Sequence, residues 1–166
     1  MDTEQQQIKR NGDKMLKVAL IGLGGMGSVH LANWRKMEGV ELVAVCDIRS
    51  DLAVKKAVNE KVYADIDELL EHETLDIVDV CTPSYLHKEH SIKAMKKGIH
   101  VLTEKPAALN SEDVAEMYRI AKDNHVKLMV AHVIRFMKDY MVLKEIYKSK
   151  KYGELLQGHF WRLSAT

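Results

Sequence analysis

Cysteine is scarce in this sequence, and neither sign of charge dominates it. The two cysteines, Cys46 and Cys81, each lie near the end of a predicted strand, and we interpret both as small buried thiols without a disulfide. The formal net charge is only +1, so the chain lacks the basic surface that nucleic-acid binding requires. We therefore expect no nucleic-acid partner.

Long apolar runs are also missing. No uncharged apolar stretch approaches the roughly 20 residues of a membrane-spanning helix, so we expect no membrane partner. Residues 1–14 are polar and offer no apolar centre for a secretion signal. These features predict a mobile tail over 1–14 and a cytoplasmic location.

The sequence does contain a glycine-rich turn between a short strand and a helix. The apolar run 18–21 precedes Gly22, Gly24 and Gly27, which have the spacing G-x-G-x-x-G. The first glycine permits a tight turn, the second lets the backbone approach a pyrophosphate, and the third lets the helix pack closely on the strand. Unpaired amides at the start of that helix favour the same diphosphate. The same glycine spacing also occurs in turns that bind no ligand. The neighbouring residues therefore determine whether this turn is a diphosphate site.

An acidic residue follows the next predicted strand, 41–46. Asp47 comes about twenty positions after Gly27, where a carboxylate can accept hydrogen bonds from the adenosine ribose hydroxyls. Its charge opposes a 2′-phosphate and so favours NAD, whereas the guanidinium of Arg49 favours NADP. A turn or helix-cap role for Asp47 is the structural alternative.

Strands and helices alternate along most of the chain. We expect further strands at 61–63, 75–81, 99–103 and 126–130. A first helix should follow the glycine turn and end at about residue 37, with further helices at 51–59, 65–72, 85–97, 112–124 and 137–149. Ser50 and Ser111 are predicted helix caps. Such alternation predicts an α/β fold with a doubly wound parallel sheet.

The predicted strand ends carry most of the chemically active residues. Asp47, Thr82, Lys105 and His132 each follow a strand, and ligands of doubly wound sheets bind beyond the carboxyl ends of the strands. We therefore expect them to converge in space. His87 and its neighbour three residues on offer a histidine pair, but no third ligand is near, so we expect no metal.

Three segments resemble the nicotinamide-dependent glucose–fructose oxidoreductase and inositol dehydrogenase family, often called Gfo/Idh/MocA. They are VDVCTPSYLHKEH at 78–90, GIHVLTEKP at 98–106 and AHVIRF at 131–136, and the Glu-Lys-Pro block is the most specific of them. The resemblance implies a dinucleotide-binding Rossmann domain at 15–150. It also implies that 151–166 begins a second α/β substrate domain that is largely absent.

The resemblance further implies an NAD cofactor, with NADP possible, and it assigns residues to each part of that cofactor. Residues assigned to the pyrophosphate are Gly22, Gly24, Met26 and Gly27, and those assigned to the adenosine ribose are Asp47, Ile48 and Arg49. Residues assigned to the inner half are Cys81, Thr82, Pro83, Ser84, Leu86 and His87, with Glu104 at the nicotinamide ribose, Lys105 beside the nicotinamide and Arg135 at the domain junction.

The activity that this resemblance implies is hydride transfer between a sugar or polyol hydroxyl and the nicotinamide, in a protein that is a homo-oligomer when full length. Lys105 is the candidate catalytic residue, because an ammonium near the hydroxyl stabilises the alkoxide-like charge of the transition state. A surface lysine paired with Glu104 is the structural alternative. Further substrate-orienting residues would lie beyond Thr166, so we expect the chain alone to be inactive.

Other functions remain open. A non-catalytic dinucleotide-binding or sensing module would use the same fold, because fold alone does not fix function. Redox-assisted chemistry, in which the nicotinamide is recycled within the reaction, is a further possibility within the family.

Calorimetric titration with NAD and, separately, NADP tests the cofactor prediction. We expect saturable binding that is tighter for NAD, because the carboxylate of Asp47 opposes the 2′-phosphate. Tighter binding of NADP would give the deciding role to Arg49. A folded chain that binds neither would contradict the cofactor assignments.

Overall fold

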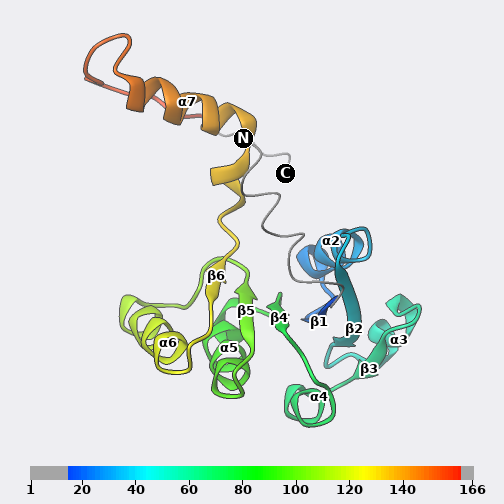
Figure 1. Ribbon diagram of the computed structural model, residues 1–166. Coiled ribbons are helices and arrows are strands. Elements are labelled where there is room, and N and C mark those ends of the chain that lie inside the picture. The colour runs from blue at the N-terminus through cyan, green and yellow to red at the C-terminus, as the bar shows by residue number, and fades with distance from the viewer. Residues whose placement is uncertain (1–14, 162–166) are drawn as a thin grey trace. The chain divides into compact units, whose positions relative to one another are not determined.

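The computed structural model describes residues 15–161, and the part up to residue 131 forms a parallel sheet covered by helices (Figure 1). The sheet order is β3-β2-β1-β4-β5-β6, and all neighbouring strands pair in parallel. The strands are β1 Leu16–Ile21, β2 Val40–Cys46, β3 Lys61–Tyr63, β4 Ile77–Val80, β5 His100–Thr103 and β6 Leu128–Val130. The predicted doubly wound α/β sheet is thereby confirmed.

The helices follow the strands in the predicted order. In the sheet-containing part they are α2 Gly25–Trp34, α3 Ser50–Lys56, α4 Ile66–His72, the 3₁₀ turn η1 Ser84–Leu86, α5 His87–Lys96 and α6 Ser111–Asp123. The two predicted serine caps are wrong. The cap position of α3 is Arg49 and no side chain bonds there, whereas α6 is capped by Asn110, which accepts a 2.8 Å hydrogen bond from the Asp113 amide.

The core has two layers because successive side chains of a strand point to opposite faces of the sheet. On β1, Ala19 and Ile21 pack in the cluster that includes buried residues of α4, α5 and α6. Leu20 between them packs with residues of α2 and α3 on the other face. Helices therefore cover both faces of the sheet, which explains why these strands read as continuous apolar runs.

Strand β1 occupies the centre of the sheet and has two parallel neighbours. Its last residue, Ile21, is paired with Cys46 of β2 on one side and with Val80 of β4 on the other. The chain progresses outward through β2 and β3, and then returns to β4 on the opposite side of β1. The carboxyl ends of β1 and β4 thus mark the topological switch point, where ligands of such folds bind.

The chain divides into two compact units, one ending at Ala131 and the other beginning at His132. The second unit contains the 3₁₀ turn η2 Val133–Phe136 and helix α7 Lys138–Ser149. Residues 154–161, within the segment 151–166 where the sequence implied the start of a second domain, have no regular secondary structure, and residues 162–166 lie outside the described part of the chain. Within 15–161, no helix has both the length and the apolar character needed to cross a membrane.

Leu69→Ala tests the packing of α4 on the sheet. Leu69 is fully buried in the larger core cluster, so the cavity should lower the free energy of unfolding by about 2–5 kcal/mol. Leu109→Ala is the matched control, because Leu109 is 68% exposed and its truncation should change stability by less than about 0.5 kcal/mol. Urea denaturation of both variants measures the difference, and equal losses would contradict the described core.

Candidate functional site

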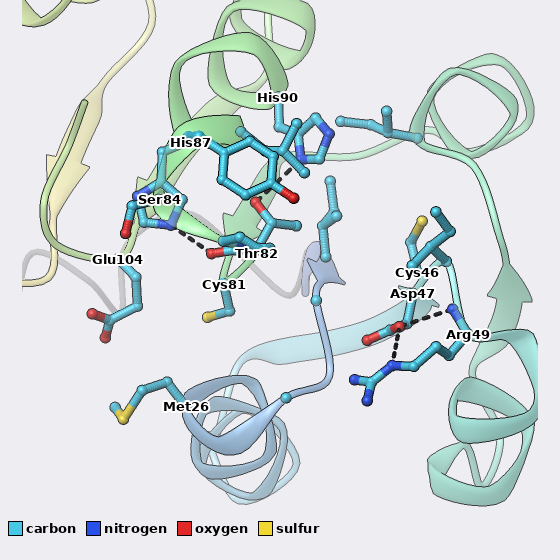
Figure 2. A pocket seen from close by; sticks show the side chains of 18 of the residues that line it. Met26, Cys46, Asp47, Arg49, Cys81, Thr82, Ser84, His87, His90 and Glu104 are labelled. Carbon is cyan, nitrogen blue, oxygen red and sulfur yellow. Dashed lines mark hydrogen bonds and ion pairs between the residues drawn. The ribbon is translucent and has the colours of Figure 1, made fainter. Parts of the chain in front are cut away.

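A pocket of about 630 Å³ lies at the carboxyl ends of the strands, within the range usual for cofactor sites. Its walls come from the turn after β1 and from the segments that follow β2, β3, β4 and β5. Figure 2 shows Met26, Asp47, Thr82 and Glu104 arranged around this space from four separate segments. Of the four strand-end residues expected to converge, Asp47, Thr82 and Lys105 lie at this pocket. His132 does not line it and belongs to the second unit.

The glycine turn is fixed by close contact among backbone segments. Gly22 has φ +87°, and a Cβ there would lie 2.6 Å from the carbonyl oxygen of Cys81. At Gly27 a Cβ would lie 1.8 Å from the carbonyl oxygen of Gly22. Only glycine fits either position, because the obstructing atoms are main-chain atoms that cannot turn away.

Gly24 differs from these two glycines. It lines the pocket, yet a Cβ at Gly24 would meet no atom within 4 Å, so the packing of the chain itself does not require glycine there. Gly24 is also the N-cap of α2, and that helix start has neither a side-chain cap nor an acidic residue in its first turn. The open backbone and uncapped amides suit a diphosphate, which needs both close approach and hydrogen-bond donors.

Asp47 lies beside the glycine turn and is held as a carboxylate. Its Oδ2 accepts a 2.8 Å hydrogen bond from the amide of Leu23, and its Oδ1 accepts a 3.0 Å bond from the amide of Arg49. Burial opposes ionisation, but these two amides and the Arg49 guanidinium outweigh it and lower the pKa of Asp47. The Arg49 side chain is 60% exposed and bonds Asp47 through Nε at 3.3 Å.

The segment after β4 is braced by two histidines. The ring of His87 is buried, with Nδ1 2.6 Å from the carbonyl oxygen of Pro106 and Nε2 2.7 Å from that of Thr82. His90 lies nearby, with Nδ1 3.2 Å from the hydroxyl of Thr82, and its burial lowers its pKa. Since both ring nitrogens of His87 face the main chain, this histidine positions the wall and offers no nitrogen to a metal.

The Glu-Lys-Pro block forms the third wall. Glu104 is buried, and its Oε2 accepts a 2.9 Å hydrogen bond from the amide of Lys105. The side chain of Lys105 is exposed at the pocket, and within residues 15–161 it makes no hydrogen bond or ion pair. The alternative in which Lys105 is paired with Glu104 is therefore not seen. The peptide bond from Lys105 to Pro106 is cis.

Glu104 is instead paired with a histidine that the sequence did not single out. His30 of α2 lies with Nδ1 2.8 Å from Asp79 Oδ2 and Nε2 3.3 Å from Glu104 Oε1. Trp34 donates its indole N–H to the same Asp79 oxygen at 2.6 Å. The hydrogen bond to Asp79 raises the pKa of His30 against the opposing effect of burial, and the nearby carboxylate charges add to the increase.

His30, Asp79 and Cys81 place potential metal-ligand atoms within 4.8 Å of one another. The His30–Asp79 distance is that of a hydrogen bond, and burial raises the pKa of the Cys81 thiol, which keeps it protonated and a poor ligand. We interpret this group as a hydrogen-bonded network. Cys46 is a free buried thiol whose pKa burial raises to about 12, whereas Cys81 is free but only half-buried, contrary to expectation.

Nearly all residues assigned from the sequence lie at this pocket. The exceptions are Gly27, which is buried under the turn, and Arg135, which belongs to the second unit. Seven lining residues were not predicted to line the site: Ile21, Cys46, Ala64, Asp65, Ile66, Tyr85 and His90. Three of these follow β3 directly, so applying the strand-end rule to that short strand would have found them.

The fold and pocket define a dinucleotide-binding α/β domain. Residues 16–132 match the model of the Gfo/Idh/MocA oxidoreductase family with its NAD-binding Rossmann fold, and the chain belongs to that family. The predicted family and the NAD-binding character of the domain are thereby confirmed.

Relatives named for different activities contain a domain similar to this chain. Inositol 2-dehydrogenase from Arthrobacter is 32% identical over 91% of this chain and 46% of its own length. 2,7-Anhydro-N-acetylneuraminate hydratase from Mediterraneibacter gnavus is 33% identical over 88% of this chain and 39% of its own length. The crystal structure of WlbA dehydrogenase from Chromobacterium violaceum, in complex with NADH and UDP-GlcNAcA, superposes with a TM-score of 0.81 at 32% identity, covering 86% of this chain and 42% of that one. The chain thus spans less than half of each relative.

Two alanine substitutions in the glycine turn separate ligand contact from packing. Gly24→Ala should leave the free energy of unfolding within about 0.5 kcal/mol of wild type, because its Cβ meets no atom. It should weaken NAD binding about tenfold or more by hindering amide contact with a charged phosphate. Gly27→Ala should cost about 3 kcal/mol of stability or more, since its Cβ overlaps the Gly22 carbonyl.

Urea denaturation and calorimetric titration of both variants provide the comparison. Unchanged NAD affinity in a folded Gly24→Ala protein would show that the open backbone of the turn does not contact the cofactor.

Proposed function

We propose that this chain is the cofactor-binding part of an NAD-dependent dehydrogenase that acts on a hydroxyl of a sugar or polyol. The observation that carries the proposal is the exposed side chain of Lys105, which has no partner within residues 15–161, at a pocket that also contains the glycine turn and the carboxylate of Asp47. The named activities of the relatives support the same substrate class. Because the chain spans less than half of those relatives, activity and substrate belong to this proposal.

Each part of NAD would be bound by a different group of residues. Gly24 and the first amides of α2 bind the pyrophosphate, and Asp47 accepts hydrogen bonds from the adenosine ribose hydroxyls. An ionised Asp47 opposes a 2′-phosphate, so NAD is favoured over NADP. Glu104 accepts hydrogen bonds from the hydroxyls of the nicotinamide ribose. It uses the lone pairs that its contacts with the Lys105 amide and His30 leave free. When bound, the nicotinamide supplies the acceptor for the hydride.

Lys105 has the position and the chemistry to act on the substrate. It is the next residue after Glu104, and its ammonium extends from the pocket wall without a protein partner among the described residues. An ammonium beside the reacting hydroxyl stabilises the negative charge that forms on oxygen as the proton leaves. If Nζ first gives a proton to solvent, the neutral amine can take the proton that leaves the hydroxyl and becomes the ammonium. Both roles require that the substrate oxygen come within hydrogen-bond distance of Nζ.

A different reaction with the same site has a specific observation in its favour. One relative at 33% identity is named a hydratase, so the domain also serves an activity that adds or removes water. The cofactor-binding residues would have the same roles in that case. Net formation of reduced nicotinamide in the presence of a polyol distinguishes a dehydrogenase, because a hydratase leaves no net reduced cofactor.

Lys105→Ala tests the catalytic assignment in an active form of the protein. Turnover of a sugar or polyol should fall by about 10²–10⁴-fold, because a transition-state interaction and a proton-transfer group are lost together. The dissociation constant for NAD should stay within about threefold, since Lys105 acts on the substrate. Lys122→Ala, an exposed lysine on α6, is the matched control and should change neither quantity.

Activity that survives in Lys105→Ala would show the catalytic assignment to be wrong. NAD binding with no turnover of any hydroxyl substrate by an intact protein would favour the non-catalytic sensing module.

A further inference from the structure

His30 lies between two buried carboxylates, one on the sheet and one at the pocket. It is nearly buried on α2, three residues after Gly27, and its two ring nitrogens face Asp79 of β4 and Glu104 after β5. Asp79 is completely buried, whereas Glu104 is both buried and part of the pocket wall. The imidazole thus joins the interior of the sheet to a residue that contacts the cofactor in the proposed function.

The hydrogen bonds of this group determine where its protons lie. Asp79 Oδ2 accepts from Trp34 Nε1 at 2.6 Å and from His30 Nδ1 at 2.8 Å, and its Oδ1 accepts from the thiol of Cys81. His30 Nδ1 therefore carries a hydrogen. Nε2 lies 3.3 Å from Glu104 Oε1, and the effect of this contact depends on whether Nε2 carries a hydrogen.

The two states of Nε2 have opposite effects on Glu104. With a proton, Nε2 donates to the carboxylate and the ring carries a positive charge that holds Oε1, while the Lys105 amide holds Oε2. Without that proton, a lone pair of nitrogen faces a carboxylate oxygen, and the contact becomes repulsive. Only the protonated ring fixes both oxygens of Glu104.

We propose that His30 is a positioning residue whose protonated ring holds the Glu104 carboxylate in the orientation that the nicotinamide-ribose end of the cofactor requires. The proposal rests on the proposed function, because it assigns Glu104 to that part of NAD. Its consequence is that NAD affinity depends on the protonation of a residue behind the pocket wall. Proton uptake accompanies binding at the pH where His30 titrates.

The pH range follows from the groups that face the ring. These are Asp79 on β4, Glu104 after β5 and, through Asp79, the thiol of Cys81; Trp34 on its own helix is uncharged. The hydrogen bond to Asp79 raises the pKa of His30 above its ordinary 6.5. The favourable contact is therefore present below pH 6.5 and is lost as the pH rises through that higher value.

A second histidine at the pocket, His90, has its pKa shifted in the opposite direction and serves as an internal comparison. Burial lowers the pKa of His90 below 6.5, so any effect of its charge is confined to more acidic solution. An effect of His30 and an effect of His90 on cofactor binding thus occur on opposite sides of pH 6.5.

The experiment measures NAD binding by calorimetry in two buffers of different ionisation enthalpy. The pH range is 5.5 to 9, from about one unit below to about two and a half units above the ordinary pKa of histidine. For the wild type we expect NAD affinity to fall roughly three- to tenfold as the pH rises through the pKa of His30, because only the protonated ring holds both oxygens of Glu104 in place. We also expect proton uptake over the same range. His30→Asn keeps a donor for Asp79 but cannot titrate, so it should lose both effects.

His72→Asn is the matched control, because His72 is an exposed histidine on α4 with no contact to this network. It should retain the pH dependence of wild type. NMR of the wild-type chain without cofactor gives an independent measurement that does not need the variant to fold. The Lys105 amide, which donates to Glu104, should shift with the same midpoint as the His30 ring.

The outcomes separate the two proposals. Wild-type protein that binds NAD with no change above neutral pH, or a Lys105 amide that does not follow the His30 titration, overturns the role of His30 and leaves the proposed function intact. A folded wild-type chain that binds no NAD at any pH overturns the proposed function and, with it, this role. If the pH dependence of NAD affinity persists in His30→Asn but disappears in His90→Asn, the effect belongs to His90 and the proposal is overturned.

Discussion

The contact between Gly22 and Gly27 is the constraint on which the rest of the site depends. It brings the start of α2 so close to the end of β1 that a single Cβ at Gly27 would overlap the Gly22 carbonyl, and Gly22 itself is pressed against Cys81 beyond β4. Three segments therefore meet with only main-chain atoms between them. The uncapped amides of α2 are directed to the switch point of the sheet because nothing larger than hydrogen separates the helix from the strand.

Buried acids surround this contact, and each is held by a different set of donors. Asp47 is held by amides of the glycine turn and of its own loop, Asp79 by side chains of α2, and Glu104 by His30 and the next amide in the chain. A buried carboxylate without such donors would be strongly destabilising. These hydrogen bonds keep the walls in place before any ligand arrives, so the site requires little rearrangement to bind a dinucleotide.

Local spacing made much of this fold and pocket predictable. The glycine pattern, the order of strands and helices and the acid after β2 are all set by neighbours in sequence, and their places were anticipated. His30, Asp79 and Glu104 were not recognised as a group because they lie far apart in the chain and meet only through the pairing of β1, β4 and β5. The cap of α6 was misplaced by one residue, since Asn110 and Ser111 are both good caps and only geometry chooses between them.

The burial and hydrogen bonding of Asp79 restrict the order in which this part of the sequence can change in evolution. Its two oxygens accept from an imidazole, an indole and a thiol at a fully buried position, so an apolar residue there would leave three donors without an acceptor. Replacing a donor alone is less harmful, because the carboxylate keeps the other two. Loss of the donor at position 34 or 81 therefore costs less than loss of the acid, and position 79 is better able to become apolar after its donors have changed. The buried acid thus imposes an order on the substitutions that this part of the domain can accept.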